Sequence, residues 1–219
     1  MVRNTNSLAH FVLHRRYVDD NSSRYLLVFN RYLCKEAPYG GELSFSESNI
    51  RDMHNADLCD TVGNLVNRAT NLCKKYCDGS ITDVAPPANL PIPNLGEIID
   101  SYSQKMDQFE LQGGANVAIQ GFRDINKYLQ EEAPWLKKGD EHAEFRQAVV
   151  HATLEAIYAL AHLLLPFTPV GAAKIFKKLG KEPVSLKDLD RGCRNLEVGT
   201  TIQVGEVLYE KVCWNSGNV

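Results

Sequence analysis

Three side chains in this sequence have the types and the spacing to contact unpaired nucleotide bases. Asn64 and Arg68 are four residues apart in a predicted helix, so their side chains share one face. Trp135 follows a proline at the predicted end of another helix, where a large ring can be held at the surface. An amide and a guanidinium suit base edges, and an indole offers a stacking plane. Without further information, an exposed polar pair and a core tryptophan are the simpler interpretation.

The composition is that of an ordinary globular protein. The chain has 219 residues, of which 44% are hydrophobic and 23% are charged, and its net charge is −3. This charge argues against coating nucleic acid by bulk electrostatics, but it permits a local basic surface. Such a surface could come from Lys74-Lys75, from Lys137-Lys138, or from Lys174, Lys177 and Lys178. A solvated helix face is the simpler interpretation of each run.

Targeting and membrane signals are weak. No uninterrupted apolar run approaches the ~18 residues of a membrane span, so we expect no membrane partner. The first residues do not resemble a cleaved signal peptide, and the expected compartment is the cytoplasm. An Arg-containing amphipathic segment at 3–16 leaves organelle targeting open.

Cysteine and histidine spacing predicts no metal site. None of the six cysteines forms a Cys-x-x-Cys pair, and the six histidines show no His-Glu-x-x-His spacing. Cys73 and Cys77 share a helix face and could hold a metal with a third ligand. Buried thiols are the simpler interpretation, because free cysteine behaves as a small apolar residue.

Apolar residues recurring at three- and four-residue steps predict an all-α protein. A capping box at Ser44 and Glu47 opens a long helix that Asp78-Gly79 ends, and one stripe of that helix is polar. Four prolines make 80–93 an extended crossover. The predicted helices span about 21–37, 44–77, 95–113, 118–133, 140–165 and 170–179, and the polar stripe comprises Asp57, Thr61, Asn64, Arg68, Asn71 and Lys75.

Helices in this order pack as an antiparallel bundle. From Val184 the pattern alternates and contains two glycines, which predicts a short hairpin or an extended tail. We therefore expect an N-terminal segment with a connecting helix at 1–43, a helical bundle at 44–183 and a C-terminal tail at 184–219.

Several motifs in a fixed order resemble one family. These are the stretch at 31–40 (RYLCKEAPYG), the stretch at 55–58 leading into Gly63–Arg68 (GNLVNR), the stretch at 125–135 that ends in EAPW, and the stretch at 163–169 (LLLPFTP). Together they resemble the C-terminal anticodon-binding domain of methionyl-tRNA synthetase, a class I aminoacyl-tRNA synthetase. The resemblance covers about residues 24–212.

The resemblance implies a function and a set of contacts. In that family the bundle binds the CAU anticodon of methionine tRNAs, which implies that Asn64, Arg68 and Trp135 contact anticodon bases. Asn126 and Lys127, which precede Trp135, are expected to support its loop. Lys174, Lys177 and Lys178 are expected to neutralise tRNA phosphates, with a solvated helix face as the alternative.

Catalytic signatures of the family are missing from this sequence. Neither the His-x-Gly-His signature nor the Lys-Met-Ser-Lys-Ser loop occurs, so we assign no catalytic residue and expect no adenylation of methionine by this chain alone. ATP and methionine would bind a catalytic domain outside the chain, and no cofactor is expected within it. Gly199 to Val212 resembles the family segment that folds back towards that domain.

Three interpretations stay open. The chain is a stand-alone tRNA-binding module, or the anticodon-binding part of a ligase completed by a catalytic domain in trans, or a helical protein-interaction module without tRNA reading. The apolar residues of the tail bear on these cases. Either they pack on the bundle, or a partner chain that completes the enzyme covers them, or the sequence is an incomplete gene product. The residues concerned are Ile202, Val204, Leu208 and Tyr209.

Overall fold

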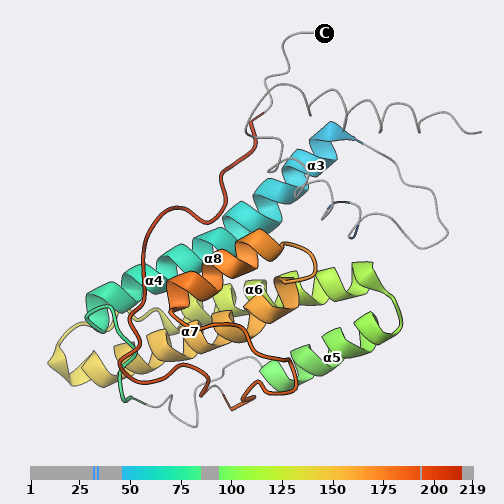
Figure 1. Cartoon of the computed structure of the whole chain (residues 1–219). Coiled ribbons are helices and arrows are strands. Elements are labelled where there is room, and N and C mark those ends of the chain that lie inside the picture. Colours follow the sequence, from blue (N-terminus) through green and yellow to red (C-terminus); the bar gives the residue numbers. More distant parts are fainter. Residues whose placement is uncertain (1–31, 33, 35–45, 85–93, 193, 214–219) are drawn as a thin grey trace, which may run out of the picture.

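The computed structural model describes residues 32, 34, 46–84, 94–192 and 194–213. Within them the predicted all-α antiparallel bundle is confirmed (Figure 1). Of the helix predicted over about 21–37, only Tyr32 and Cys34 are described, and both are helical. The elements are α3 (Glu47–Met53), η2 (His54–Gly63), α4 (Asn64–Tyr76), α5 (Leu95–Asp107), α6 (Leu111–Glu132), η3 (Asp140–His142), α7 (Ala143–Leu164) and α8 (Pro169–Leu179).

The first three elements form one continuous rod (Figure 1). The hydroxyl of Ser46 accepts from the Asn49 N–H and caps the rod, so Glu47 is its first helical residue. The predicted capping box is therefore wrong in its register, and Ser44 lies outside the described residues. The predicted stop is confirmed, because Asp78 and Gly79 adopt left-handed φ values of 51° and 75°.

Ten residues in the middle of the rod, His54–Gly63, wind as a π-helix. The N–H of Asn64 accordingly reaches back five residues to the carbonyl of Cys59. The wider turns change the phase of the predicted polar stripe. Asp57 is only 2% exposed and pairs with Arg123 of α6 at 2.7 Å. Some side chains of the stripe, such as Asp57, therefore face α6, and others, such as Asn64, face solvent.

The α5–α6 corner differs from the prediction. The helix that begins at Leu95 ends at Asp107, and Phe109 adopts a left-handed φ of 59°. Gly113 and Gly114, predicted as a helix end, lie inside the first turn of α6. A Cβ at Gly114 would lie 2.6 Å from Met106 Sδ, so α5 and α6 approach closely here and an alanine would require the Met106 side chain to move. Gly114 therefore lies at a close contact between two helices and does not end a helix.

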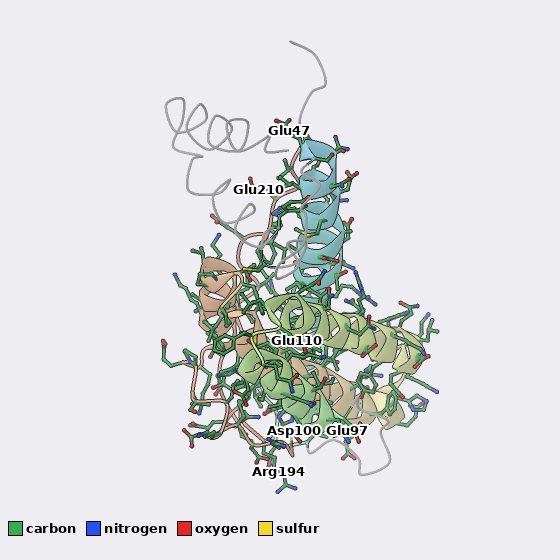
Figure 2. The ribbon with its side chains drawn as sticks, turned by 90° about the vertical axis from the view of Figure 1, so that its right-hand side faces the viewer. Glu47, Glu97, Asp100, Glu110, Arg194 and Glu210 are labelled. Carbon is green, nitrogen blue, oxygen red and sulfur yellow. The ribbon has the colours of Figure 1, made fainter. Side chains whose placement is uncertain are left out.

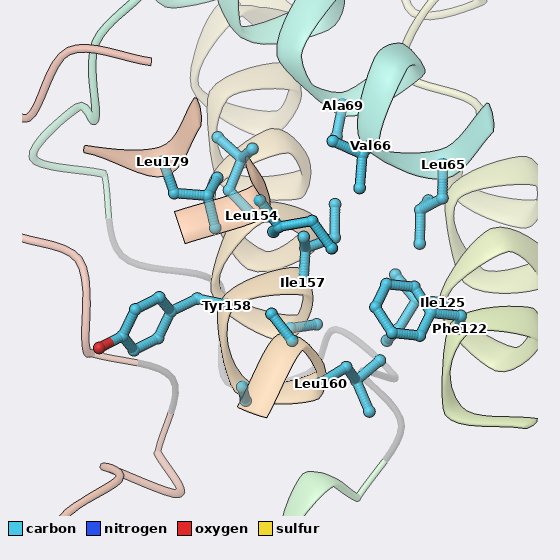
Figure 3. Close-up of a cluster of buried hydrophobic side chains, with 14 of the residues drawn as sticks. Leu65, Val66, Ala69, Phe122, Ile125, Leu154, Ile157, Tyr158, Leu160 and Leu179 are labelled. Carbon is cyan, nitrogen blue, oxygen red and sulfur yellow. The ribbon is translucent and has the colours of Figure 1, made fainter. Parts of the chain in front are cut away.

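Helix α7 is the core of the bundle. Every residue from Ala148 to Leu164 is buried, and the side chains of α4, α6 and α8 converge on it (Figure 3). By length and composition Asp140–Leu164 could cross a membrane, but 89% of its apolar window is buried inside the molecule. This burial is that of a central core helix. The labelled core includes Leu65, Phe122, Ile125, Leu154, Ile157 and Leu179 (Figure 3).

The segment after α8 is extended, so of the two predicted alternatives, a hairpin and an extended tail, the extended tail is the one observed. It forms a single antiparallel bridge, between Thr201 and Ser80, and no strand occurs in the described residues. Ile202 and Leu208 are each 5% exposed, so the tail packs on the bundle. It then rises beside η2 and α3 (Figure 1), where the Asn55 side chain binds both the N–H and the carbonyl of Val212.

Candidate nucleic-acid interface

Trp135 lies in a tight turn directly after α6. Ala133 ends this helix in the left-handed conformation, with φ of 40°, and its N–H still donates to the carbonyl of Leu129. Pro134 cannot continue the helix, because it has no N–H to donate. The Trp135 ring is half-buried and packs against the edge of the hydrophobic core. Part of the indole is thereby fixed, and part of it faces solvent.

The guanidinium of Arg68 lies over this ring. Its Cζ is 5.3 Å from the ring centroid, which is within cation–π range. Arg68 Nη2 also donates to Gln130 Oε1 at 3.2 Å, so it joins α4 to the last turns of α6. Arg68 and Trp135, two of the three residues predicted to contact bases, are thus in direct contact in the fold.

Asn64 stands one helical turn before Arg68, at the first position of α4. Its side chain is exposed and makes no hydrogen bond to any residue that the structure describes. The amide is therefore available to a ligand beside the stacked pair.

Asn126 and Lys127 differ in their surroundings. Asn126 Nδ2 donates to the carbonyl of Thr61 in η2 at 3.0 Å and to that of Phe122 at 3.1 Å. It thus fixes α6 against the turn that precedes Asn64, rather than the loop of Trp135. Lys127 is exposed on α6 and lies 3.8 Å from Glu131.

The lysines of α8 form a separate basic surface. Lys174 and Lys177 are exposed, whereas Lys178 donates a hydrogen bond to the Val204 carbonyl of the tail. Burial lowers the pKa of Lys178. In the described part of the chain, no contact connects these lysines to Arg68 or Trp135, because α8 packs against α7 and the tail.

A second group of cations and aromatic rings lies beside the stacked pair, and the sequence analysis found only part of it. Lys75 Nζ and Arg146 Cζ lie 5.0 and 5.3 Å from the Tyr76 ring centroid. Lys137 Nζ lies 5.9 Å from that of Phe145. The lysines were visible as the pairs Lys74-Lys75 and Lys137-Lys138. Arg146 gave no local signal, because it joins the group only through the fold.

Four basic side chains at this end of the bundle make no ion pair with any residue that the structure describes. Among the described residues no carboxylate lies within 4 Å of Arg68, Lys75, Lys137 or Arg146. Some basic side chains elsewhere are paired, as in Arg123–Asp57 at 2.7 Å, Arg191–Asp100 at 2.8 Å and Lys211–Asp60 at 2.9 Å, whereas Lys174 and Lys177 of α8 also make no ion pair with a described residue. The uncompensated cations define what we call the basic aromatic end, made of Arg68, Lys75, Tyr76, Trp135, Lys137 and Arg146.

The cysteine pair of α4 is part of the core. Cys73 and Cys77 are both buried, and the Cys73 thiol donates to the carbonyl of Ser80 at 3.6 Å. A hydrogen bond to Cys77, together with burial, holds the pKa of Cys73 well above its usual range. Among the described residues there is no group of three or more His, Cys, Asp or Glu side chains that could hold a metal ion.

Similarity to known proteins agrees with the fold. A family described as the anticodon binding domain of methionyl tRNA ligase matches residues 83–216. Methionine–tRNA ligase of Thermotoga maritima is 27% identical over 188 residues, which cover 84% of this chain and 30% of the relative. The enzyme of a Synechocystis species is 32% identical over 160 residues, or 69% of this chain and 29% of that enzyme. The chain thus spans less than a third of either relative.

Solved structures show the same architecture. The free form of Mycobacterium tuberculosis methionyl-tRNA synthetase superimposes with a TM-score of 0.77 at 22% identity, over 91% of this chain and 42% of that one. The same enzyme in complex with methionyl-adenylate gives a TM-score of 0.71 at 24% identity, over 83% and 37%. Fold and sequence define the class, an anticodon-binding domain of an aminoacyl-tRNA synthetase. In particular, the chain belongs to the methionyl-tRNA ligase anticodon-binding family.

Proposed function

We propose that this chain binds methionine tRNA by its CAU anticodon loop, as the anticodon-binding part of a methionyl-tRNA ligase. The observation that carries the proposal is the stack of Arg68 on Trp135, at the end of the bundle where cations are unpaired. Chemistry on ATP and methionine would belong to a catalytic domain, which joins this chain in trans or in a longer protein.

Trp135, Asn64 and Arg68 would each contribute a different interaction with a base. A base flipped out of the loop can stack on the indole of Trp135, and such stacking is worth about 1–3 kcal/mol per base. Asn64 can donate and accept at a Watson–Crick edge, and Arg68 adds donors in a fixed plane. Stacking supplies affinity for any base, so discrimination among bases must come from Asn64 and Arg68.

Cations of the basic aromatic end would hold the backbone of the bound loop. Lys75, Lys137 and Arg146 have no carboxylate partner among the described residues, so phosphates can approach them without displacing an existing ion pair. Each phosphate neutralised on a single strand steepens the salt dependence, with a slope of about −0.7 in log K against log salt. Binding should therefore weaken as salt rises, despite the net charge of −3.

A titration with labelled anticodon stem-loops at two salt concentrations tests the proposal. We expect a CAU loop to bind more tightly than a loop with a changed first anticodon base. Trp135→Ala should weaken CAU binding by about 5- to 150-fold, the equivalent of one lost stacking contact. Leu136→Ala, next in the chain and 70% exposed, is the matched control. Equal affinity of the intact protein for both loops would contradict the proposal.

Two related questions have separate tests. Aminoacylation on adding a catalytic domain would support completion in trans, and no charging of tRNA in such a mixture would count against it.

The interaction-module alternative requires an apolar partner surface around residues 1–30 or on the tail. Ile202 and Leu208 are buried against the bundle, which leaves the tail less surface to offer. Residues 1–30 lie outside the described residues.

A further inference from the structure

The loop that carries Trp135 is held by one side chain from another helix. Arg146, in the first turn of α7, donates through Nη1 to the carbonyls of Lys137 and Gly139 at 2.7 and 2.8 Å. These carbonyls lie two and four residues after Trp135. A single guanidinium nitrogen therefore fixes the path of the chain directly beyond the indole.

The same guanidinium also contacts α4, the helix that carries Arg68. Its Cζ lies 5.3 Å from the Tyr76 ring centroid, and the neighbouring Gln147 Nε2 donates to the carbonyl of Tyr76 at 3.2 Å. Arg146 thus connects three parts of the basic aromatic end: the end of α4, the loop after α6 and the start of α7. Figure 1 shows these parts at one end of the bundle.

We propose that Arg146 is a positioning residue for base stacking, which sets the orientation of the Trp135 indole relative to Arg68. The inference rests on the proposed function for its RNA consequence, but its structural part concerns the free protein. Arg146 does not have to touch RNA for this role. It acts through the loop, because the indole can lie under Arg68 only if the backbone after α6 keeps its course.

The chemistry of the contacts requires arginine. Two carbonyls and an aromatic face are bound at once, and the planar guanidinium can satisfy both kinds of contact from one position. A lysine would keep the charge but could not stack flat on Tyr76 while it donates to both carbonyls. Arg146→Lys therefore separates positioning from charge.

Fluorescence of Trp135 provides a direct test. The sequence contains two tryptophans, so Trp214→Phe leaves Trp135 as the sole indole. In this background, Arg146→Lys and Arg146→Ala should shift the emission of the free protein to the red and make quenching by acrylamide more efficient. Both should also bind the CAU stem-loop about tenfold more weakly, as partial loss of a stacking contact would do.

Two further variants complete the design. Arg191→Ala removes an arginine whose partner, Asp100, lies at the N-terminal half of α5, and it should leave the emission unchanged. Figure 2 shows Asp100 close to Glu97, on α5. Gly139→Ala disturbs the same loop while keeping Arg146, because Gly139 has φ of 91°, a backbone conformation that is strained for alanine. It should reproduce the spectral change.

The outcomes are distinct. A purely structural role for Arg146 would lower the melting temperature without moving the emission or the quenching, and this result would overturn the inference. Unchanged spectra in Arg146→Lys and Gly139→Ala would do the same, even if Arg146→Ala failed to fold. Altered spectra in a protein that shows no preference for CAU would support the positioning role and contradict the proposed function.

Discussion

Arg68 covers one side of the Trp135 ring, with 5.3 Å between the guanidinium carbon and the ring centroid. An incoming base must therefore use the remaining exposed part of the indole or displace the guanidinium. A cation–π contact at an exposed site is worth about 0.5–1 kcal/mol. This energy is smaller than the stacking energy of a base on the indole, so a base can displace the Arg68 guanidinium from the ring. The guanidinium would then be free to reach a base edge.

Replacing Arg68 by lysine should weaken CAU stem-loop binding by about tenfold, because lysine loses both the planar stack and the fork that reaches Gln130. Stability should fall by no more than about 1 kcal/mol, the value of an exposed cation–π contact. Binding titrations and thermal melts measure the two effects. Arg191→Lys, a matched surface change, should alter neither, and full CAU affinity in Arg68→Lys would exclude a base-contacting role.

The unpaired cations should determine the salt dependence. Lys75→Gln and Lys137→Gln are each expected to lower the slope of log K against log salt by about 0.7, with little effect on the preference for CAU. Lys211→Gln serves as the control, because Lys211 already pairs with Asp60 at 2.9 Å. Titration from 50 to 200 mM salt, roughly the range over which such slopes are clear, gives the result. An unchanged slope in Lys75→Gln and Lys137→Gln would mean that these two lysines do not bind the RNA phosphates.

Two glycines of α6 should respond differently to alanine. A Cβ at Gly121 would lie 2.6 Å from Leu160 Cδ2, which is fully buried in α7. Overpacking there should cost about 1–3 kcal/mol. The corresponding contact at Gly113 is the flexible Lys105 side chain at 2.9 Å, so Gly113→Ala should be neutral or gain up to about 1 kcal/mol of helix propensity. Urea unfolding compares the two, and similar stabilities would contradict the close α6–α7 approach.

A buried histidine should make stability depend on pH. Burial alone would lower the pKa of His151, but Glu155, 3.7 Å away, and the hydrogen-bonded Val84 carbonyl raise it overall. The folded state thus holds this proton more tightly than the unfolded state. Its stabilising effect is fully present below the ordinary pKa of 6.5 and is lost as pH rises through the higher folded-state pKa.

The difference in stability between the wild type and His151→Gln should therefore be larger at pH about 6 than at pH about 9. Urea unfolding at the two pH values measures it, with the half-exposed His142→Gln as the control. Burial lowers the pKa of His162, which acts in the opposite sense, so the comparison must be between variant and parent at each pH. A difference that does not vary with pH would mean that His151 keeps the same protonation when the protein unfolds.

Helix ends that depend on one or two neighbouring residues could be predicted from the sequence. Pro134 cannot extend α6, and Asp78-Gly79 adopts left-handed backbone after α4, so both ends could be predicted from the sequence. The family resemblance placed Arg68 and Trp135 in one base-contacting site, and the structure brings them together, although their direct contact was not predicted. Their roles in binding bases remain predictions.

Features that depend on tertiary packing could not be predicted. Gly113 and Gly114 suggested a helix end, but both lie inside α6, where Gly114 is close to the Met106 side chain of α5. Arg146 carries no motif, because its partners are two loop carbonyls and a ring on another helix. The π-helix was missed because the three- and four-residue steps in this stretch were interpreted as ordinary α-helical spacing, and no local motif marks the wider turns.

The π-helix has a consequence for insertions and deletions. Removing one residue from His54–Gly63 would be absorbed by a return to ordinary α-helical winding, because the tighter turns of the remaining residues offset most of the roughly 100° that one residue contributes. Arg68 would then keep its contact with the Trp135 ring, and Asn55 would stay close to the Val212 backbone that it binds through both of its polar atoms. The π-helix thus makes the rod tolerant of the loss of one residue between two attachments that share no contact.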